Sequence, residues 1–124
     1  MTCTASIREI DQIMLVELCG RFTMTDASGM IRGTVGDLLA AGHKRILLDL
    51  AKVTYLDSAA GIGELVASYV SALHHGAEVK LLRAGKNVNR VLEIVGLHTV
   101  FEIYDDEASA IRSFGSSQLA STAT

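Results

Sequence analysis

The sequence predicts a single small α/β domain with a mixed, mostly parallel sheet that opens with a β-hairpin. Three observations lead to this prediction. The chain has 124 residues, which is the length of one domain. Two consecutive strand-like segments begin the chain, and short apolar runs then alternate with stretches of helical periodicity. Because parallel neighbouring strands need a crossover connection, this alternation favours helices that follow strands.

Apolar runs and glycines set the expected elements, because the chain has no proline. The strands are expected over residues 7–10, 13–19, 45–50 (extended or followed by 53–56), 78–83 and 100–104. The helices are expected over residues 26–41, 61–75 and 88–95, and from a cap at Asp105 or Asp106 through 114. Asp11 and Gln12 form the expected hairpin turn, Gly20 ends the second strand, and Thr25 caps the first helix.

These elements predict one domain over residues 1–114, followed by a flexible tail over 115–124. The tail consists mostly of small and hydroxylated residues, and it has too little apolar area to pack. The domain itself has ample core material, since 49% of the chain is hydrophobic.

Composition excludes several classes of protein. A net charge of -3 disfavours direct nucleic-acid binding, which needs a positive surface. No apolar run approaches the roughly 18 residues of a membrane span, so membrane insertion is not expected. The first residues lack the basic and apolar segments of a secretory signal. Cys3 and Cys19 are too few for a disulfide scaffold, and a reduced, cytoplasmic setting is therefore expected.

Motifs for catalysis or cofactor binding are missing. Gly85-Lys86 lacks the remainder of a P-loop, Val66 replaces the third glycine of a dinucleotide fingerprint, and Ser58 is not in a Gly-x-Ser-x-Gly elbow. The four histidines, His43, His74, His75 and His98, are not spaced as a ligand pair. No catalytic residue, no metal site and no cofactor is therefore expected.

One acidic cluster has two interpretations. It consists of Glu102, Asp105, Asp106 and Glu107, which could form an acid/base or magnesium site. A solvated helix start is the more frequent role of such a cluster, because the helix dipole favours acidic groups there.

The segment from Asp57 to Gly63 lies at an expected junction between a strand and a helix. In a purely structural interpretation, Asp57 or Ser58 caps the helix and the small residues allow close packing on the sheet. In a functional interpretation, the Ser58 hydroxyl is exposed at the helix start and open to phosphorylation. The helix amides would then stabilise the phosphate.

Several separated motifs, in this order, resemble the STAS domain, which bacterial anti-sigma factor antagonists share with the cytoplasmic tails of sulfate transporters. The motifs are Ile46-Leu47-Leu48-Asp49-Leu50, Val53-Thr54-Tyr55-Leu56-Asp57-Ser58, Gly61-Ile62-Gly63-Glu64-Leu65-Val66, Val79-Lys80-Leu81-Leu82 and Val91-Leu92-Glu93-Ile94-Val95-Gly96-Leu97. The resemblance implies a small α/β fold that performs no catalysis itself.

In the antagonists, a partner anti-sigma kinase phosphorylates the serine after the motif aspartate, which here is Ser58. The unphosphorylated form binds the kinase and frees the sigma factor, and the ATP and magnesium belong to the kinase. The resemblance therefore implies an anti-sigma factor serine kinase as the partner. The partner surface is expected to comprise Thr23, Met24, Thr25, Asp57, Ser58, Ala59, Gly61 and Ile62. The segments 21–25 and 57–63 should meet at one end of the sheet.

The chain departs from the family pattern in two places. Ala59 and Ala60 separate Ser58 from Gly61, where the family normally has one residue. A bulge after Ser58 would keep the acceptor in place, whereas a shifted helix start would turn it by about 100°. In addition, Gly20-Arg21-Phe22-Thr23 ends in a hydroxyl residue where many antagonists have an aspartate.

Two other functions stay open beside the phosphorylated antagonist. One is a STAS scaffold, or a transporter-associated subunit, that docks on partners without being modified. The other is a small-ligand carrier or an enzyme with a pocket at the carboxyl ends of the strands. Whether the chain forms a homodimer is also open.

Overall fold

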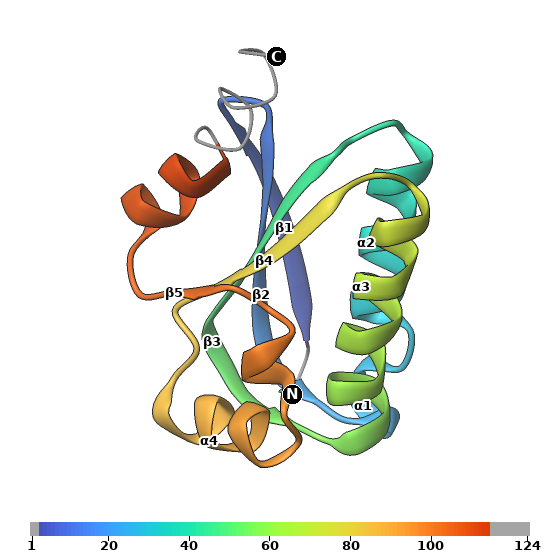
Figure 1. The fold of residues 1–124 in the computed structure, drawn as a ribbon. Coiled ribbons are helices and arrows are strands. Elements are labelled where there is room, and N and C mark those ends of the chain that lie inside the picture. The colour runs from blue at the N-terminus through green and yellow to red at the C-terminus, as the bar shows by residue number, and fades with distance from the viewer. Residues whose placement is uncertain (1–2, 115–124) are drawn as a thin grey trace.

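The computed structural model describes residues 3–114 and contains a five-stranded sheet in the order β1-β2-β3-β4-β5 (Figure 1). The strands are β1 (Thr4–Ile10), β2 (Ile13–Phe22), β3 (Arg45–Leu56), β4 (Glu78–Leu82) and β5 (Ile103–Tyr104). β1 pairs with β2 in antiparallel fashion, and every other neighbouring pair is parallel. The predicted fold class is confirmed. The tail predicted over 115–124 lies outside the described residues.

Helices cover both faces of this sheet. They are α1 (Met24–Ala27), α2 (Met30–Ala40), α3 (Glu64–His74), α4 (Lys86–Ile94), the π-helical turn η1 (Ser58–Gly63), the 3-10 turn η2 (Leu97–Thr99) and a helix over residues 107–114. In Figure 1, α2 and α3 lie side by side against one face, α4 lies at one end of the sheet, and the helix over 107–114 lies on the opposite side. Among residues 3–114, no helix combines the length and apolar character needed to cross a bilayer.

Alternate residues of the central strands fill two cores. Leu48 belongs to the larger core beneath α2 and α3, whereas Leu47 packs with Ala110 and Phe114 of the last helix. Because β3 is covered on both faces, its first half is a continuous apolar run, as the sequence pattern indicates.

The hairpin is confirmed, but several strand ends differ from the prediction. Asp11 and Gln12 have φ values of 50° and 68°, which are typical of a tight two-residue hairpin turn. The prediction that Gly20 ends β2 was wrong. Gly20 has a φ of 119° beside a register shift, so the strand bends there and continues to Phe22. β5 is shorter than predicted, because η2 ends at Thr99 and only two residues then pair with β4.

The first predicted helix, over residues 26–41, is two helices. Gly29 adopts a φ of 82° between α1 and α2, a conformation that glycine adopts without strain. The prediction of Thr25 as the cap was also wrong. Thr23 is the cap, because its hydroxyl accepts the Asp26 N–H at 3.2 Å.

Candidate functional site

The candidate site lies where β2 and β3 end. Phe22 and Leu56 are register partners at the last position of these parallel strands. The following residues then stay together, since the Asp57 N–H donates to the Phe22 carbonyl at 3.0 Å. The structure therefore brings the two predicted segments, 21–25 and 57–63, to the same end of the sheet.

Asp57 holds the site together through its carboxylate. Oδ1 accepts the backbone N–H groups of Ala59, Ala60 and Gly61 at 3.1, 2.6 and 3.1 Å. Oδ2 accepts the backbone N–H of Met24 at 2.8 Å. Desolvation raises the pKa of this carboxyl group, but the four N–H donors outweigh it and lower the pKa below its ordinary value. Asp57, and not Ser58, is thus the helix cap.

The additional residue in the motif is accommodated by η1. The Ile62 N–H donates to the Asp57 carbonyl at 2.8 Å, which spans five residues instead of the four of an α-helix. This single widened turn contains the extra alanine, and α3 follows it directly. Ser58 is the first residue of the turn, and its side chain is exposed. The extra residue is thus accommodated locally, within the turn that begins at Ser58, and that Ser58 keeps the acceptor position stays a prediction.

Close packing explains the glycine after the two alanines. A Cβ on Gly61 would lie 2.7 Å from the Leu56 Cβ and 2.9 Å from the Leu56 Cα. Such contacts are impossible without moving η1 away from β3. Gly61 is buried, so its role in the structure is to let the turn pack against the strand.

The backbone N–H groups at the helix start are already occupied. Those of residues 59–61 donate to the Asp57 carboxylate, and that of Ile62 donates to the Asp57 carbonyl. Stabilisation of a phosphate on Ser58 by these amides stays a prediction, and in this structure the amides of residues 59–61 already donate to Asp57. Within residues 3–114, no group is hydrogen bonded to the Ser58 hydroxyl, and Ser58 is exposed.

Glu64 is a structural residue of the site that sequence analysis did not identify. Its side chain is buried, and its carboxylate accepts the Gly29 N–H at 2.5 Å and the Arg32 N–H at 3.1 Å. It thereby caps α2 from the first turn of α3. One feature of the sequence could have pointed to Glu64. It is the only acidic residue between Asp57 and Glu78, and the other residues of its helix are apolar, small or aromatic apart from one histidine.

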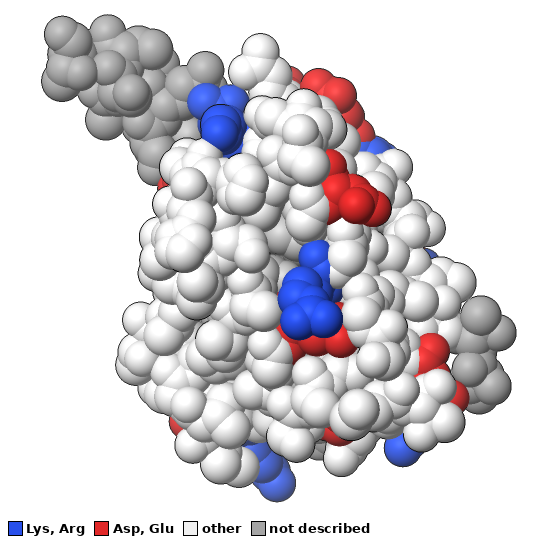
Figure 2. Space-filling view, turned by 90° about the vertical axis from the view of Figure 1, so that its right-hand side faces the viewer, with Lys and Arg blue, Asp and Glu red and all other residues white. Residues whose placement is uncertain are grey.

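A shallow pocket near Ser58 lies between the α1–α2 segment and the η1–α3 segment. It has a volume of about 330 Å³ and is lined by Met24, Ser28, Arg32, Ala59, Ala60, Gly63 and Glu64. Met24 is 62% exposed at its edge. Figure 2 shows that the face carrying α2 and α3 is mostly uncharged, with a few basic and acidic groups, of which one basic and one acidic group lie side by side near the centre. Val66, Val70 and Leu73 of α3 are also exposed. The surface that runs from Met24 along α3 is therefore suited to contact an apolar partner surface.

Comparisons with known proteins identify the family. The sequence profile of the STAS domain matches residues 4–110. The chain belongs to the STAS domain family. An anti-sigma F factor antagonist of Paenibacillus polymyxa is 26% identical over 100 residues, which cover 80% of this chain and 84% of that protein.

Solved structures have the same STAS fold. An anti-sigma factor antagonist from Mycobacterium paratuberculosis superposes with a TM-score of 0.79 at 20% identity, over 90% of this chain and 93% of the other. The Bacillus cell fate determinant SpoIIAA in its phosphorylated form superposes with a TM-score of 0.69 at 16% identity, over 90% of this chain and 99% of the other.

The predicted partner residues of this STAS domain differ in exposure. Met24, Thr25, Ser58 and Ala59 are exposed. Thr23, Asp57 and Ile62 are half-buried, and Ile62 packs against the core. A partner at this end of the sheet would therefore meet chiefly the exposed side chains.

Three residues of the acidic cluster, Glu102, Asp106 and Glu107, have separate structural contacts. The Glu102 carboxylate accepts the Tyr104 hydroxyl at 2.5 Å and lies 3.3 Å from Lys80 Nζ, and both contacts help to lower the pKa of Glu102. Asp106 accepts the Ser109 N–H at 2.9 Å and caps the last helix, whereas Glu107 pairs with Arg8 at 3.1 Å. In the described part of the chain, no three His, Cys, Asp or Glu side chains are grouped to hold a metal ion.

Proposed function

We propose that this protein is an anti-sigma factor antagonist that binds an anti-sigma kinase and is switched off when that kinase phosphorylates Ser58. The observation that carries the proposal is the geometry of the Asp57–Ser58 pair. The carboxylate fixes the turn through four backbone N–H groups, and the next side chain is an exposed hydroxyl. The site thus offers an acceptor that a kinase can reach while the fold stays intact.

A phosphate on Ser58 would act on the partner and leave the fold in place. It would add a charge of about -1.5 to -2. Asp57 already accepts the amides of residues 59–61, and the phosphate would lie beside this carboxylate of the same sign. Met24 and mostly uncharged side chains lie around this position, and Arg32 is the basic residue among those that line the adjacent pocket. A docked partner would have to desolvate the phosphate against an apolar surface, which is costly. Phosphorylation of Ser58 would therefore release the kinase.

The chemistry of phosphoryl transfer belongs to the partner in this proposal. ATP and magnesium are bound by the kinase, and this chain supplies the acceptor hydroxyl. Family membership and the names of the relatives support the antagonist role, and one neighbour in fold, SpoIIAA, is described in a phosphorylated form. We place the exchange in the cytoplasm, where the kinase and its sigma factor meet.

Binding to a cognate anti-sigma kinase tests the proposal. We expect Ser58→Ala to bind like the wild type and Ser58→Asp to bind at least about tenfold more weakly, or about 1.4 kcal/mol, in calorimetric titrations. Ser6→Asp is the matched control, because Ser6 is an exposed serine on β1. Equal affinity of Ser58→Asp and Ser6→Asp for the kinase would contradict the proposal and favour the unmodified scaffold.

A further inference from the structure

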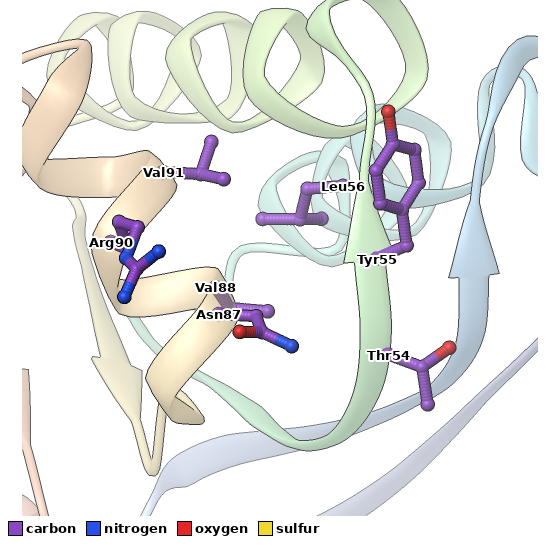
Figure 3. Close-up of a pocket in the computed structure, with 7 residues that line it drawn as sticks. All are labelled: Thr54, Tyr55, Leu56, Asn87, Val88, Arg90 and Val91. Atoms are coloured by element: carbon purple, nitrogen blue, oxygen red, sulfur yellow. The ribbon is translucent and has the colours of Figure 1, made fainter.

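A second groove lies on the other side of β3, between the end of that strand and α4 (Figure 3). Its volume is about 290 Å³, and it is lined by Thr54, Tyr55, Leu56, Asn87, Val88, Arg90 and Val91. In Figure 3, Leu56 and Val91 point toward one another across the gap, and Asn87 projects from α4 toward β3. Leu56 and Val88 are buried, so the floor of this groove is apolar.

One basic residue lines this groove, and two more lie next to residues that line it. Arg90 lines the groove, and the Arg21 guanidinium lies 5.0 Å from the centre of the Tyr55 ring. Lys86, the first residue of α4, precedes the lining residue Asn87. All three basic side chains are exposed, and no carboxylate of residues 3–114 lies within ion-pair distance of any of them. The groove itself contains no acidic residue, although the whole chain has a net charge of -3.

We infer that this groove docks an acidic segment of a partner protein. An aliphatic side chain of the segment enters between Leu56 and Val91, and its neighbouring carboxylates lie against Arg90 and Arg21. Complementary charge favours such a segment, since none of the three cations forms an ion pair within residues 3–114. A nucleic acid would need a longer row of cations on a less acidic protein. The inference goes beyond the proposed function, because it concerns the α4 side of β3 and does not depend on Ser58.

Nuclear magnetic resonance with two short peptides tests the inference. The probe is acetyl-Asp-Leu-Glu-Leu-Asp-amide, and the comparison is acetyl-Lys-Leu-Lys-Leu-Lys-amide, both titrated into the ¹⁵N-labelled protein. We expect the acidic peptide alone to shift the backbone signals of residues 54–56 and 87–91 in a saturable manner. High salt should weaken the effect, since the charges are exposed.

Charge reversal identifies the contact. Arg90→Glu should weaken binding of the acidic peptide about tenfold, whereas the matched control Arg112→Glu, on the last helix, should leave it unchanged. If the Arg90→Glu protein does not give a native spectrum, Arg90→Gln is tested instead. A smaller loss of affinity for the acidic peptide is then expected. Absence of shifts, equal shifts with both peptides, or unchanged binding by the Arg90 variants would overturn the inference. Because no kinase takes part, such a failure is separate from a failure of the proposed function.

Discussion

Met24 donates its backbone N–H to Oδ2 of Asp57 at 2.8 Å, and this bond connects the segment after β2 to the segment after β3. The same carboxylate caps η1 through Oδ1. One side chain therefore fixes both segments that surround Ser58. The exposed hydroxyl has a defined position because its neighbour, and not the serine itself, makes the structural hydrogen bonds.

Loss of this carboxylate should destabilise the fold. Asp57→Ala leaves four backbone N–H groups without their acceptor, and we expect the free energy of unfolding at neutral pH to fall by about 1–2 kcal/mol. Urea denaturation measures the change. Asp37→Ala is the control, since Asp37 is an exposed carboxylate of α2, and its effect should stay within about 0.5 kcal/mol.

The same site predicts a dependence on pH. The folded state lowers the pKa of Asp57, so its carboxylate adds stability above the unfolded pKa of about 3.9. This contribution is lost as the pH falls through the folded pKa. Asp57→Asn should therefore lose less stability than the wild type between neutral pH and pH values below about 4. Identical pH profiles of the two proteins would contradict the assigned role of Asp57.

Removal of the buried Glu64 carboxylate should be more costly. Glu64→Ala leaves the Gly29 and Arg32 N–H groups without their acceptor at the start of α2, and we expect a loss of about 2–3 kcal/mol of stability. Glu64→Gln keeps one carbonyl oxygen as an acceptor and should retain part of the stability that Glu64→Ala loses. Hydrogen exchange should show that the loss begins at α2. A protein with Glu64→Ala that is as stable as the wild type would refute this contact.

Deletion of Ala59 tests the widened turn. Because η1 contains one residue more than an α-helical turn needs, the deletion should convert it to a regular turn while α3 keeps its position. We expect a thermal midpoint close to that of the wild type by circular dichroism. Deletion of Ala67, inside α3, is the control and should destabilise strongly, because every later residue of α3 turns by about 100°. Similar losses in both variants would count against the π-helical accommodation.

Met24 provides a direct probe of the partner surface. Its side chain is 62% exposed, so Met24→Glu should weaken kinase binding by about tenfold while the free energy of unfolding changes by less than about 0.5 kcal/mol. Ile62 is a poorer probe, since it packs against the core and a charge there would also destabilise the fold. Unchanged kinase affinity of Met24→Glu would remove this residue from the interface.

Local patterns predicted most of the fold. Helical and strand periodicity located the elements, since their apolar faces are set by burial against one sheet. The break at Gly29 could not be predicted in this way, because Glu64, 35 residues further along the chain, holds the start of α2. The extent of β2 was missed for a related reason. Gly20 has the properties of a strand end, but pairing with β3 carries the strand through it.

The site was predicted in part. Asp57 is one of two cap candidates in the sequence, and its position at the end of a strand made the junction visible. The sequence did not decide between a bulge and a shifted helix start, because two alanines are compatible with either backbone geometry. The hydrogen bond from Met24 to Asp57 could not be foreseen, since it joins residues 33 positions apart.

The most direct test of the central claim is to locate the phosphate by mass spectrometry. The protein is incubated with its kinase and ATP, and the peptide over residues 53–80 is sequenced. We predict a single phosphate on Ser58 and none on the Ser58→Ala variant, because Ala59 and Ala60 offer no hydroxyl and the exposed Thr54 and Tyr55 lie before Asp57 on β3. A phosphate on Thr54 or Tyr55, or no phosphate with a kinase that binds the protein, would contradict the account.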